Sequence, residues 1–334
     1  MFAGSKGSVY CANFDRFIFR EAAMHSRRGR RVNVVSIGEV LWDIVGEQEY
    51  LGGASFNFSA HLTKLGHTVS FISAVGADPR GRKILQRMDE LGISDRYVRI
   101  DPEHATGIVT VKVDAVGQPT FVLQRPAAYD FPQLTEPQFQ QISSQPIDWI
   151  YFGTLHQMSP IARDLTTKLL DRIPHAPRFY DVNLRPDSYT PSLVRELMAY
   201  ATVVKLNDTE VTQISEMFER PCESVEDFCR TYSAKFGWKT VCVTRGSEGC
   251  ALFAGGQYFE ADGYRVDVAD TVGAGDAFAA ALLHGLGNRW PAPQIADFAN
   301  RIGALVASSP GAIPSWTLED ARALENKSRR LESA

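Results

Sequence analysis

The stretch DTVGAGDAF (270–278) places three small residues and an acid directly before an apolar segment. Gly273, Ala274 and Gly275 can leave their backbone amides open to a ligand, and the positive end of a helix dipole adds to the attraction for an anion. Such a site suits a phosphoryl group, whose transition-state charge lies on its equatorial oxygens. Asp276 could take the proton of a hydroxyl that attacks phosphorus. The stretch alone fits equally well with Asp276 as the N-cap of a helix after a glycine turn.

Two other phosphate-binding patterns are incomplete. GADPRGRK (76–83) has the glycine spacing of a P-loop, but Arg82 occupies the lysine position and no hydroxyl follows it for magnesium. Asp78 would also bring negative charge into the cradle, so we expect a helix start with Asp78 at its N-terminus. In VGAGDAF, Phe278 replaces the third glycine of a dinucleotide fingerprint, which argues against a nicotinamide cofactor.

A second group of polar residues lies near the start of the chain, in GEVLWD (38–43) and LGGASFN. Asp43 ends an apolar strand, where its carboxylate could accept hydrogen bonds from two sugar hydroxyls. Gly52 and Gly53 allow the backbone to approach a small polar ligand closely. Asn57 offers both a donor and an acceptor to a polyol, with helix capping as its alternative role. His61 lies one turn further along the same helix face, where we expect it to pack.

These stretches together resemble the ribokinase-type sugar kinases of the PfkB family. DTVGAGDAF resembles the family's C-terminal signature, and GEVLWD with LGGASFNFSAHLTKLG (51–66) resembles its N-terminal sugar-binding signature. Three further segments lie between them in the family's order, and the resemblance covers about residues 32–316. These segments are DVNLRP (181–186), KLNDTE (205–210) and VTRGSEG (243–249).

The resemblance implies an α/β, ribokinase-like fold: a mostly parallel central sheet with helices on both faces, plus a small β-sheet lid. It implies an ATP-dependent kinase that uses Mg²⁺ and phosphorylates a sugar. Asp43, Gly52, Gly53 and Asn57 would bind the sugar, and Asp276 with the 273–275 amides would carry the catalysis. A catalytically inactive, sugar-sensing regulator is the alternative of a different class, although Gly273, Gly275 and Asp276 are all present.

The nucleotide and ion sites are implied by the resemblance as well. Asn207 and Glu210 form an N-x-x-E element that would act near Mg²⁺, largely through water, with an N-cap role for Asn207 as the alternative. Asp270, the Val272 carbonyl and the Gly311 region resemble a site for a monovalent cation such as K⁺. The residues implied for ATP binding are Lys205, Asn207, Glu210, Thr244, Gly246, Gly249 and Asn300.

The identity of the sugar rests on fewer residues. Arg125, in FVLQRPAAYD, and Arg185, in DVNLRP, could contact substrate or form surface salt bridges. Their segments look most like bacterial fructokinase-type members, so fructose is the first expectation. A guanidinium could equally bind a carboxylate, which makes 2-keto-3-deoxygluconate the second, and ribose or a nucleoside is the third. Phe56 departs from the smaller residues usual after GGA, and it could narrow the sugar pocket or pack beneath it.

The elements that must position these residues alternate between strands and helices from Val32 onward. Repeated βα units predict a mostly parallel sheet with helices on both faces. TGIVTVKVDAVGQPTFVLQ (106–124) interrupts the alternation as two strands, and with 39–53 it would form the lid. We therefore expect one kinase domain over 32–320 and a C-terminal helix and tail over 321–334. The family's lid strands often pair between subunits, which favours a homodimer.

Composition narrows the class of protein. The 334 residues carry a net charge of −4, without the basic excess of a nucleic-acid binder, and no apolar run is long enough to span a membrane. Five cysteines without a C-x-x-C pair argue against zinc and disulfides and favour a cytoplasmic setting. Residues 1–31 hold seven basic and two acidic residues and no secretory signal. We expect this leader to be disordered or extraneous, with Met24 as the natural start.

Overall fold

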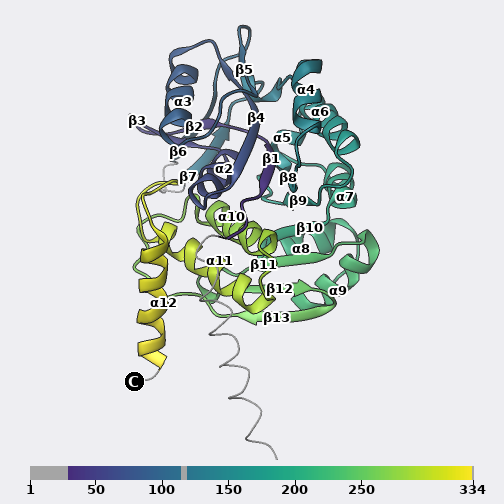
Figure 1. Ribbon diagram of the computed structural model, residues 1–334, viewed down its shortest axis with the longest axis vertical. Helices are drawn as coiled ribbons and strands as arrows, with labels where there is room; N and C mark the ends of the chain where they lie inside the picture. The colour runs from purple at the N-terminus through teal and green to yellow at the C-terminus, as the bar shows by residue number, and fades with distance from the viewer. Residues whose placement is uncertain (1–28, 114–118, 333–334) are drawn as a thin grey trace, which may run out of the picture. The chain divides into compact units, whose positions relative to one another are not determined.

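The computed structural model describes residues 29–113 and 119–332 (Figure 1). The chain divides into two units, Met1–Arg31 and Val32–Ala334, and every site residue named above lies in the second. The predictions for the basic leader and for Met24 fall, apart from residues 29–31, outside the described residues.

A nine-stranded sheet forms the centre of the second unit, in the order β13-β12-β11-β10-β9-β8-β1-β4-β5. Its strands are parallel except for the antiparallel pairs β11–β12 and β12–β13 at one edge. The strands are β1 (Asn33–Ile37), β4 (Thr68–Gly76), β5 (Val98–Asp101), β8 (Trp149–Gly153), β9 (Arg178–Asp181), β10 (Val203–Asn207), β11 (Thr240–Thr244), β12 (Cys250–Ala254) and β13 (Gln257–Ala261).

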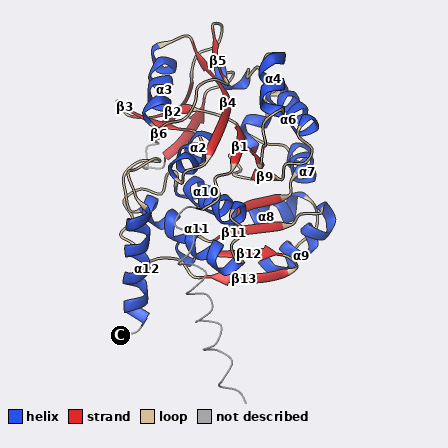
Figure 2. Ribbon diagram, viewed as in Figure 1, coloured by secondary structure: helices blue, strands red, loops and turns tan. Residues whose placement is uncertain are grey.

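Helices cover both faces of this sheet (Figure 2), because successive residues of each buried strand point to opposite sides. Val34, Tyr151 and Phe179 pack with one group of helices, whereas Val35 and Phe152 pack with the other. The first group is α2 (Ala54–Lys64), α3 (Pro79–Glu90), α10 (Ala274–Gly287), α11 (Ala292–Ala307) and α12 (Leu318–Glu332). The second group is α4 (Glu136–Ser143), α6 (Pro160–Arg172), α7 (Pro191–Tyr200), α8 (Asp208–Met217) and α9 (Val225–Phe236). Short helices complete the chain: η1 (Ala128–Asp130), α5 (Thr154–Gln157) and η2 (Gly246–Glu248).

A separate four-stranded sheet has the order β3-β2-β6-β7. It is built from two hairpins, and β2 and β6 pair in parallel where the hairpins meet. We refer to this sheet as the lid. Its strands are β2 (Leu41–Val45), β3 (Gln48–Gly52), β6 (Gly107–Val113) and β7 (Pro119–Leu123).

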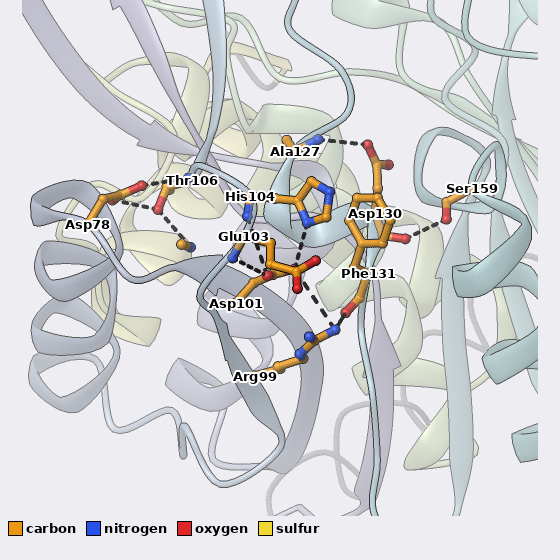
Figure 3. Close-up of polar contacts among 11 residues, drawn as sticks. Asp78, Arg99, Asp101, Glu103, His104, Thr106, Ala127, Asp130, Phe131 and Ser159 are labelled. Atoms are coloured by element: carbon orange, nitrogen blue, oxygen red, sulfur yellow. Dashed lines mark hydrogen bonds and ion pairs between the residues drawn. The ribbon is translucent and has the colours of Figure 1, made fainter.

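Two polar clusters hold the segments that enter and leave the second hairpin of the lid (Figure 3). Asp78 caps α3 through the Gly81 amide and also accepts hydrogen bonds from the amide and hydroxyl of Thr106, the residue before β6. Asp130 accepts a hydrogen bond from the Ala127 amide and thereby fixes the loop after β7. The expectation that Asp78 begins a helix is confirmed, and its carboxylate is engaged by protein groups.

The strand order locates the functional end of the fold. Along the chain, β1, β4 and β5 build the sheet in one direction, and β8, β9, β10 and β11 build it in the other. In open α/β sheets, ligands bind outside the carboxyl ends of the strands where this direction reverses. The reversal lies between the adjacent strands β1 and β8, so the site is expected beyond their carboxyl ends and those of β9 and β10.

The predicted fold class is confirmed: a mostly parallel sheet covered on both faces, together with a smaller sheet. Within the part of the chain that the structure describes, no helix has the length and apolar character needed to cross a membrane. The cysteines among the described residues, Cys222, Cys229, Cys242 and Cys250, are free thiols.

Candidate active site

The N-terminus of α10 provides open backbone amides. The helix begins at Ala274, and its N-cap Gly273 has a left-handed backbone with φ of 78°. A side chain at Gly273 would lie 2.4 Å from the Ala312 carbonyl oxygen, so this position requires glycine. Ala274 donates weakly to the Thr271 carbonyl at 3.3 Å. The amides of Gly273 and Gly275 make no hydrogen bond within the described residues, and these two amides are free for an anion.

Asp276 lies beside these amides in the first turn of α10 and is half-buried. The Asn57 side chain donates to its Oδ2 at 2.9 Å, from the first turns of α2. The pKa of Asp276 is raised to about 6. Burial is the largest cause, and the nearby Asp181 carboxylate adds to the rise, while the Asn57 hydrogen bond, Lys205 and Arg185 oppose it. A carboxylate with this pKa is ionised at neutral pH and can still accept a proton efficiently.

Asn57 therefore contacts the proposed base instead of capping its own helix. The N-cap of α2 is Gly53, which has no side-chain cap. The Oδ1 atom of Asn57 is buried and has no hydrogen-bond partner among the described residues. An acceptor held in this way is available to a ligand hydroxyl, which agrees with the predicted sugar-binding role.

A buried ion pair lies below the α10 N-terminus. Lys205 Nζ, on β10, donates to Asp181 Oδ1 at 2.9 Å, and the two side chains are 9% and 1% exposed. Tyr151 Oη donates to the other carboxylate oxygen at 3.2 Å. A Cβ atom placed on Gly275 would lie 3.8 Å from Lys205 Nζ, so the ammonium group faces the free amides. The amides and the ammonium group together can hold a multiply charged anion beside a base.

Asp43 forms the opposite wall from lid strand β2. Its carboxylate is half-buried and makes no hydrogen bond within the described residues. Burial raises its pKa to about 6, whereas Arg185 lowers it. A Cβ atom on Gly52 would lie 2.5 Å from Asp43 Oδ2, so only glycine leaves this carboxylate accessible.

Arg185 lies in an exposed loop after β9. Its guanidinium group interacts electrostatically with Asp43 and with Asp276 and makes no hydrogen bond within the described residues. Asn183 and Asp187 flank it with φ of 39° and 59°, a left-handed conformation that Asn and Asp tolerate better than most residues. The loop thus brings the guanidinium group near enough to both carboxylates to lower the pKa of each.

Unlike Arg185, Arg125 has its guanidinium group engaged by other protein groups. Its guanidinium group forms an ion pair with Asp130 and donates to the Leu155 carbonyl at 3.1 Å. Its donors therefore hold the loop after β7, which corresponds to the salt-bridge alternative for this residue. A direct contact between Arg125 and substrate has no support in this geometry.

Glu39 is a site residue that the sequence analysis missed. It follows β1 and is buried, and its Oε1 accepts a hydrogen bond from the Ser55 amide at 3.3 Å. The carboxylate thus caps the N-terminus of α2, which Gly53 cannot cap. Burial raises the pKa of Glu39 to about 7, and Asp276 contributes to the rise. Only its place directly after an apolar strand could have marked it in the sequence.

The N-x-x-E element on α8 forms a capping box. Asn207 Oδ1 accepts from the Glu210 amide at 2.8 Å, and Glu210 Oε2 accepts from the Asn207 amide at 2.8 Å. Glu210 Oε1 also accepts from the Leu184 amide, in the loop that presents Arg185. The N-cap alternative for Asn207 is thus observed, and its role near magnesium stays a prediction. Among the described residues, no three His, Cys, Asp or Glu side chains cluster as a metal site.

The other predicted nucleotide residues fall into two groups. Thr244 ends β11 directly beside Asn207 of β10, and Gly246 begins the turn that follows. Gly249 and Asn300 both lie against the segment after β13. A Cβ atom on Gly249 would meet the Ala261 carbonyl, and Asn300 donates to the carbonyls of Ala261 and Asp262 at 3.3 and 3.1 Å. Asn300 thus uses its amide group to hold this segment, and a contact with adenine stays a prediction.

The three residues of the predicted cation site come together. The Asp270 carboxylate accepts hydrogen bonds from the amides of Val272 and Gly311 at 3.0 and 3.1 Å. These contacts join the loop before α10 to the loop after α11. The Asp270 carboxylate is engaged by these two amides, and the binding of potassium stays a prediction.

Comparison with known proteins gives a family and several relatives. Residues 33–318 match the family described as pfkB family carbohydrate kinase. An aminoimidazole riboside kinase from Salmonella typhimurium is 30% identical over 304 residues, which cover 85% of this chain and 92% of the relative. A fructokinase from Escherichia coli is 28% identical over 296 residues, which cover 83% and 94%. The crystal structure of a fructokinase with bound ATP from Xylella fastidiosa matches with a TM-score of 0.80 at 20% identity, covering 89% of this chain and 99% of the other.

We predict that Lys205→Met destabilises the protein, because it leaves the Asp181 carboxylate buried without its counterion. Breaking one side of a buried pair costs about 3–5 kcal/mol, which urea denaturation can measure. The double variant Asp181→Asn/Lys205→Met removes both charges and should recover part of this loss. Equal stability of Lys205→Met and the native protein would contradict a stabilising pair.

Proposed function

The chain belongs to the pfkB family of carbohydrate kinases, and we propose that it transfers the γ-phosphoryl group of ATP to a primary hydroxyl of fructose. Family membership itself makes the protein a phosphotransferase that acts on an alcohol. The observation that carries the proposal is the hydrogen-bonded pair of Asn57 and Asp276 beside the free amides of Gly273 and Gly275.

The proposed reaction uses each of these groups once. The sugar hydroxyl gives its proton to Asp276 as its oxygen attacks the γ-phosphorus in line, and ADP leaves from the opposite side. The Gly273 and Gly275 amides and Lys205 hold the equatorial oxygens as charge shifts onto them. Asn57 keeps the Asp276 carboxylate oriented, and its free Oδ1 can accept from the sugar. Bound Mg²⁺ would neutralise phosphate charge, reaching Asn207 and Glu210 through water.

The charged groups around the proposed sugar site favour a substrate that carries no charge. A carboxylate-bearing sugar such as 2-keto-3-deoxygluconate needs an available cation. Arg125 is paired with Asp130, and Arg185 already interacts with two carboxylates, Asp43 and Asp276. Adding a third negative group beside Arg185 is therefore unfavourable. Phe56 does not distinguish substrates, because it is fully buried and packs edge-on against Phe71 beneath the site.

A nucleoside is the second candidate acceptor. The 30% identical relative is named an aminoimidazole riboside kinase, and its acceptor also offers a primary hydroxyl on a neutral sugar. The charges described above favour a neutral acceptor, and both compounds are neutral.

We propose that two subunits pair through the lid. Val45 and Tyr50 are 48% and 45% exposed on β2 and β3, and β3 is an edge strand. Register and alternation place both on the face that carries Asp43. A second copy covering this face would shield apolar surface and exclude water from the sugar site. We also propose a reducing, cytoplasmic setting, with which the free thiols agree.

An ADP-release assay with ATP and Mg²⁺ tests the acceptor. We expect fructose to give a kcat/KM at least about tenfold above that for 2-keto-3-deoxygluconate, ribose, glucose, adenosine and aminoimidazole riboside, which corresponds to about 1.4 kcal/mol. Preference for a nucleoside would replace fructose but keep the chemistry, and preference for the keto-deoxy acid would contradict the charge argument. Runs with and without potassium test whether the Asp270 site binds an activating cation.

Asp276→Asn should lower kcat by about 10²–10⁴-fold and leave sugar binding measurable by calorimetry, because only proton transfer is lost. In the native enzyme the base must be ionised, so kcat/KM should fall as the pH drops through about 6, the raised pKa of Asp276. Asp89→Asn is a matched control, since this exposed aspartate on α3 makes no side-chain hydrogen bond or ion pair within the described residues. Near-native turnover of Asp276→Asn would exclude it as the base.

Light scattering tests the assembly. We expect a dimer that Val45→Asp converts to a monomer with a raised KM for sugar, because charge on this face opposes its burial. Ile161→Asp is the control, since Ile161 is 47% exposed on α6, away from the lid. A native monomer, or a dimer unaffected by Val45→Asp, would exclude pairing through this face.

A further inference from the structure

His61 joins the sugar-binding helix α2 to a segment more than 250 residues away along the chain. It is fully buried. Its Nε2 lies 2.9 Å from the Ala312 carbonyl oxygen, and the Trp316 indole nitrogen lies 3.1 Å from its Nδ1. Lys64, on the next turn of the same face, donates to the Pro314 carbonyl at 3.2 Å. Helix α2 thus holds the segment 312–316 at three points.

These partners fix the protonation state of the ring. A carbonyl oxygen can only accept, so Nε2 of His61 must carry the proton. An indole nitrogen can only donate, so Nδ1 must be unprotonated. The pKa of His61 is lowered to about 4, chiefly by burial and in smaller part by the Lys64 charge. The ring is therefore neutral at physiological pH and has neither nitrogen available for substrate.

The segment that His61 holds forms one wall of the phosphoryl site. The Ala312 carbonyl oxygen would lie 2.4 Å from a Cβ atom on Gly273, so the two backbones are in close contact. Gly311, the preceding residue, donates to the Asp270 carboxylate and so fixes the loop that leads into α10. A shift of Ala312 would therefore be transmitted directly to Gly273, the residue whose free amide begins the anion site.

We propose that His61 is a positioning residue for phosphoryl transfer, which sets the Gly273 amide through the Ala312 carbonyl. This inference rests on the proposed function, in which that amide holds the transferred group. His61 also lies one turn beyond Asn57 on α2, so one helix orients both the proposed base and the amides opposite it. If His61 served packing alone, an apolar side chain of similar size would replace it without effect on the chemistry.

The test compares His61→Leu, His61→Gln and His284→Leu. Leucine fills the space but cannot donate to Ala312, whereas the glutamine amide can reach the position of Nε2 and donate. His284→Leu is the matched control: it removes another buried histidine, hydrogen-bonded to His67 at 2.8 Å. His284 lies eleven residues beyond Gly273, about 16 Å along α10 at 1.5 Å per residue. We measure kcat, KM for sugar and ATP, and the folded fraction by circular dichroism.

We expect His61→Leu to lower kcat by about 10–100-fold per folded molecule, because misplacement by about 1 Å is enough for such a loss. Both KM values should stay within about threefold, since ground-state contacts remain. His61→Gln should recover kcat to within about threefold, and His284→Leu should affect stability and leave kcat unchanged. Binding of ADP–Mg²⁺ with aluminium fluoride, a mimic of the transferring phosphoryl group, should weaken in His61→Leu by a similar factor, while binding of ADP alone should not.

Native kcat in folded His61→Leu, or an equal loss in His284→Leu, would overturn the inference. Where His61→Leu does not fold, Trp316→Phe replaces it: this variant keeps the aromatic packing but frees Nδ1, and its kcat should fall between those of the glutamine and leucine variants. Native kcat in Trp316→Phe would then overturn the inference. Failure of the proposed function is recognised separately, as turnover that survives in Asp276→Asn.

Discussion

The hydrogen bond between Asn57 and Asp276 is the contact on which the rest of the site depends. It joins the first turns of α2 and α10, which are 219 residues apart in the chain. Helix α10 packs against α2 and α11, and its buried residues include four alanines, Ala277, Ala279, Ala280 and Ala281. Small side chains allow helices to approach closely. Close approach of α2 and α10 is what lets Asn57 reach Asp276.

Acidic side chains outnumber basic ones in the candidate site. Among the described residues, the carboxylates of Glu39, Asp43, Asp181 and Asp276 lie near two cations, Lys205 and Arg185. Burial raises the pKa of Glu39, Asp43 and Asp276 to about 6 or 7, and a neighbouring carboxylate adds to the rise for Glu39 and for Asp276. A triphosphate entering such a site needs more positive charge than the chain supplies. Backbone amides supply part of it, and a divalent cation that arrives with the nucleotide would supply the rest.

The sequence predicted those features that depend on neighbouring residues. The hydrophobic period and the glycine positions predicted the strands and helices. The GAGD stretch predicted the open amides and the neighbouring acid at the start of α10, because four consecutive residues form them. Glu39 and the Asp181–Lys205 pair could not be derived in this way, since each acts on groups from another strand or helix. Arg125 also has a partner that the sequence did not indicate. As a lone arginine after a strand it resembled a substrate contact, but it pairs with Asp130, five residues further on. Spacing of five residues in a loop carries no information about contact, unlike spacing of four in a helix.

His61 was expected to pack, and its burial agrees with that expectation, but its two nitrogens have partners that no local pattern could indicate. Both partners lie in the short segment between α11 and α12, a region without regular structure that has no backbone ladder to hold it. Such a segment must be fixed by side chains, and the side chains that do so come from the helix carrying Asn57. As a consequence, three hydrogen bonds tie helix α2 to the segment that contacts Gly273. A kinase gains from this arrangement, because the hydroxyl and the phosphorus must be aligned to within a fraction of an ångström before transfer can occur.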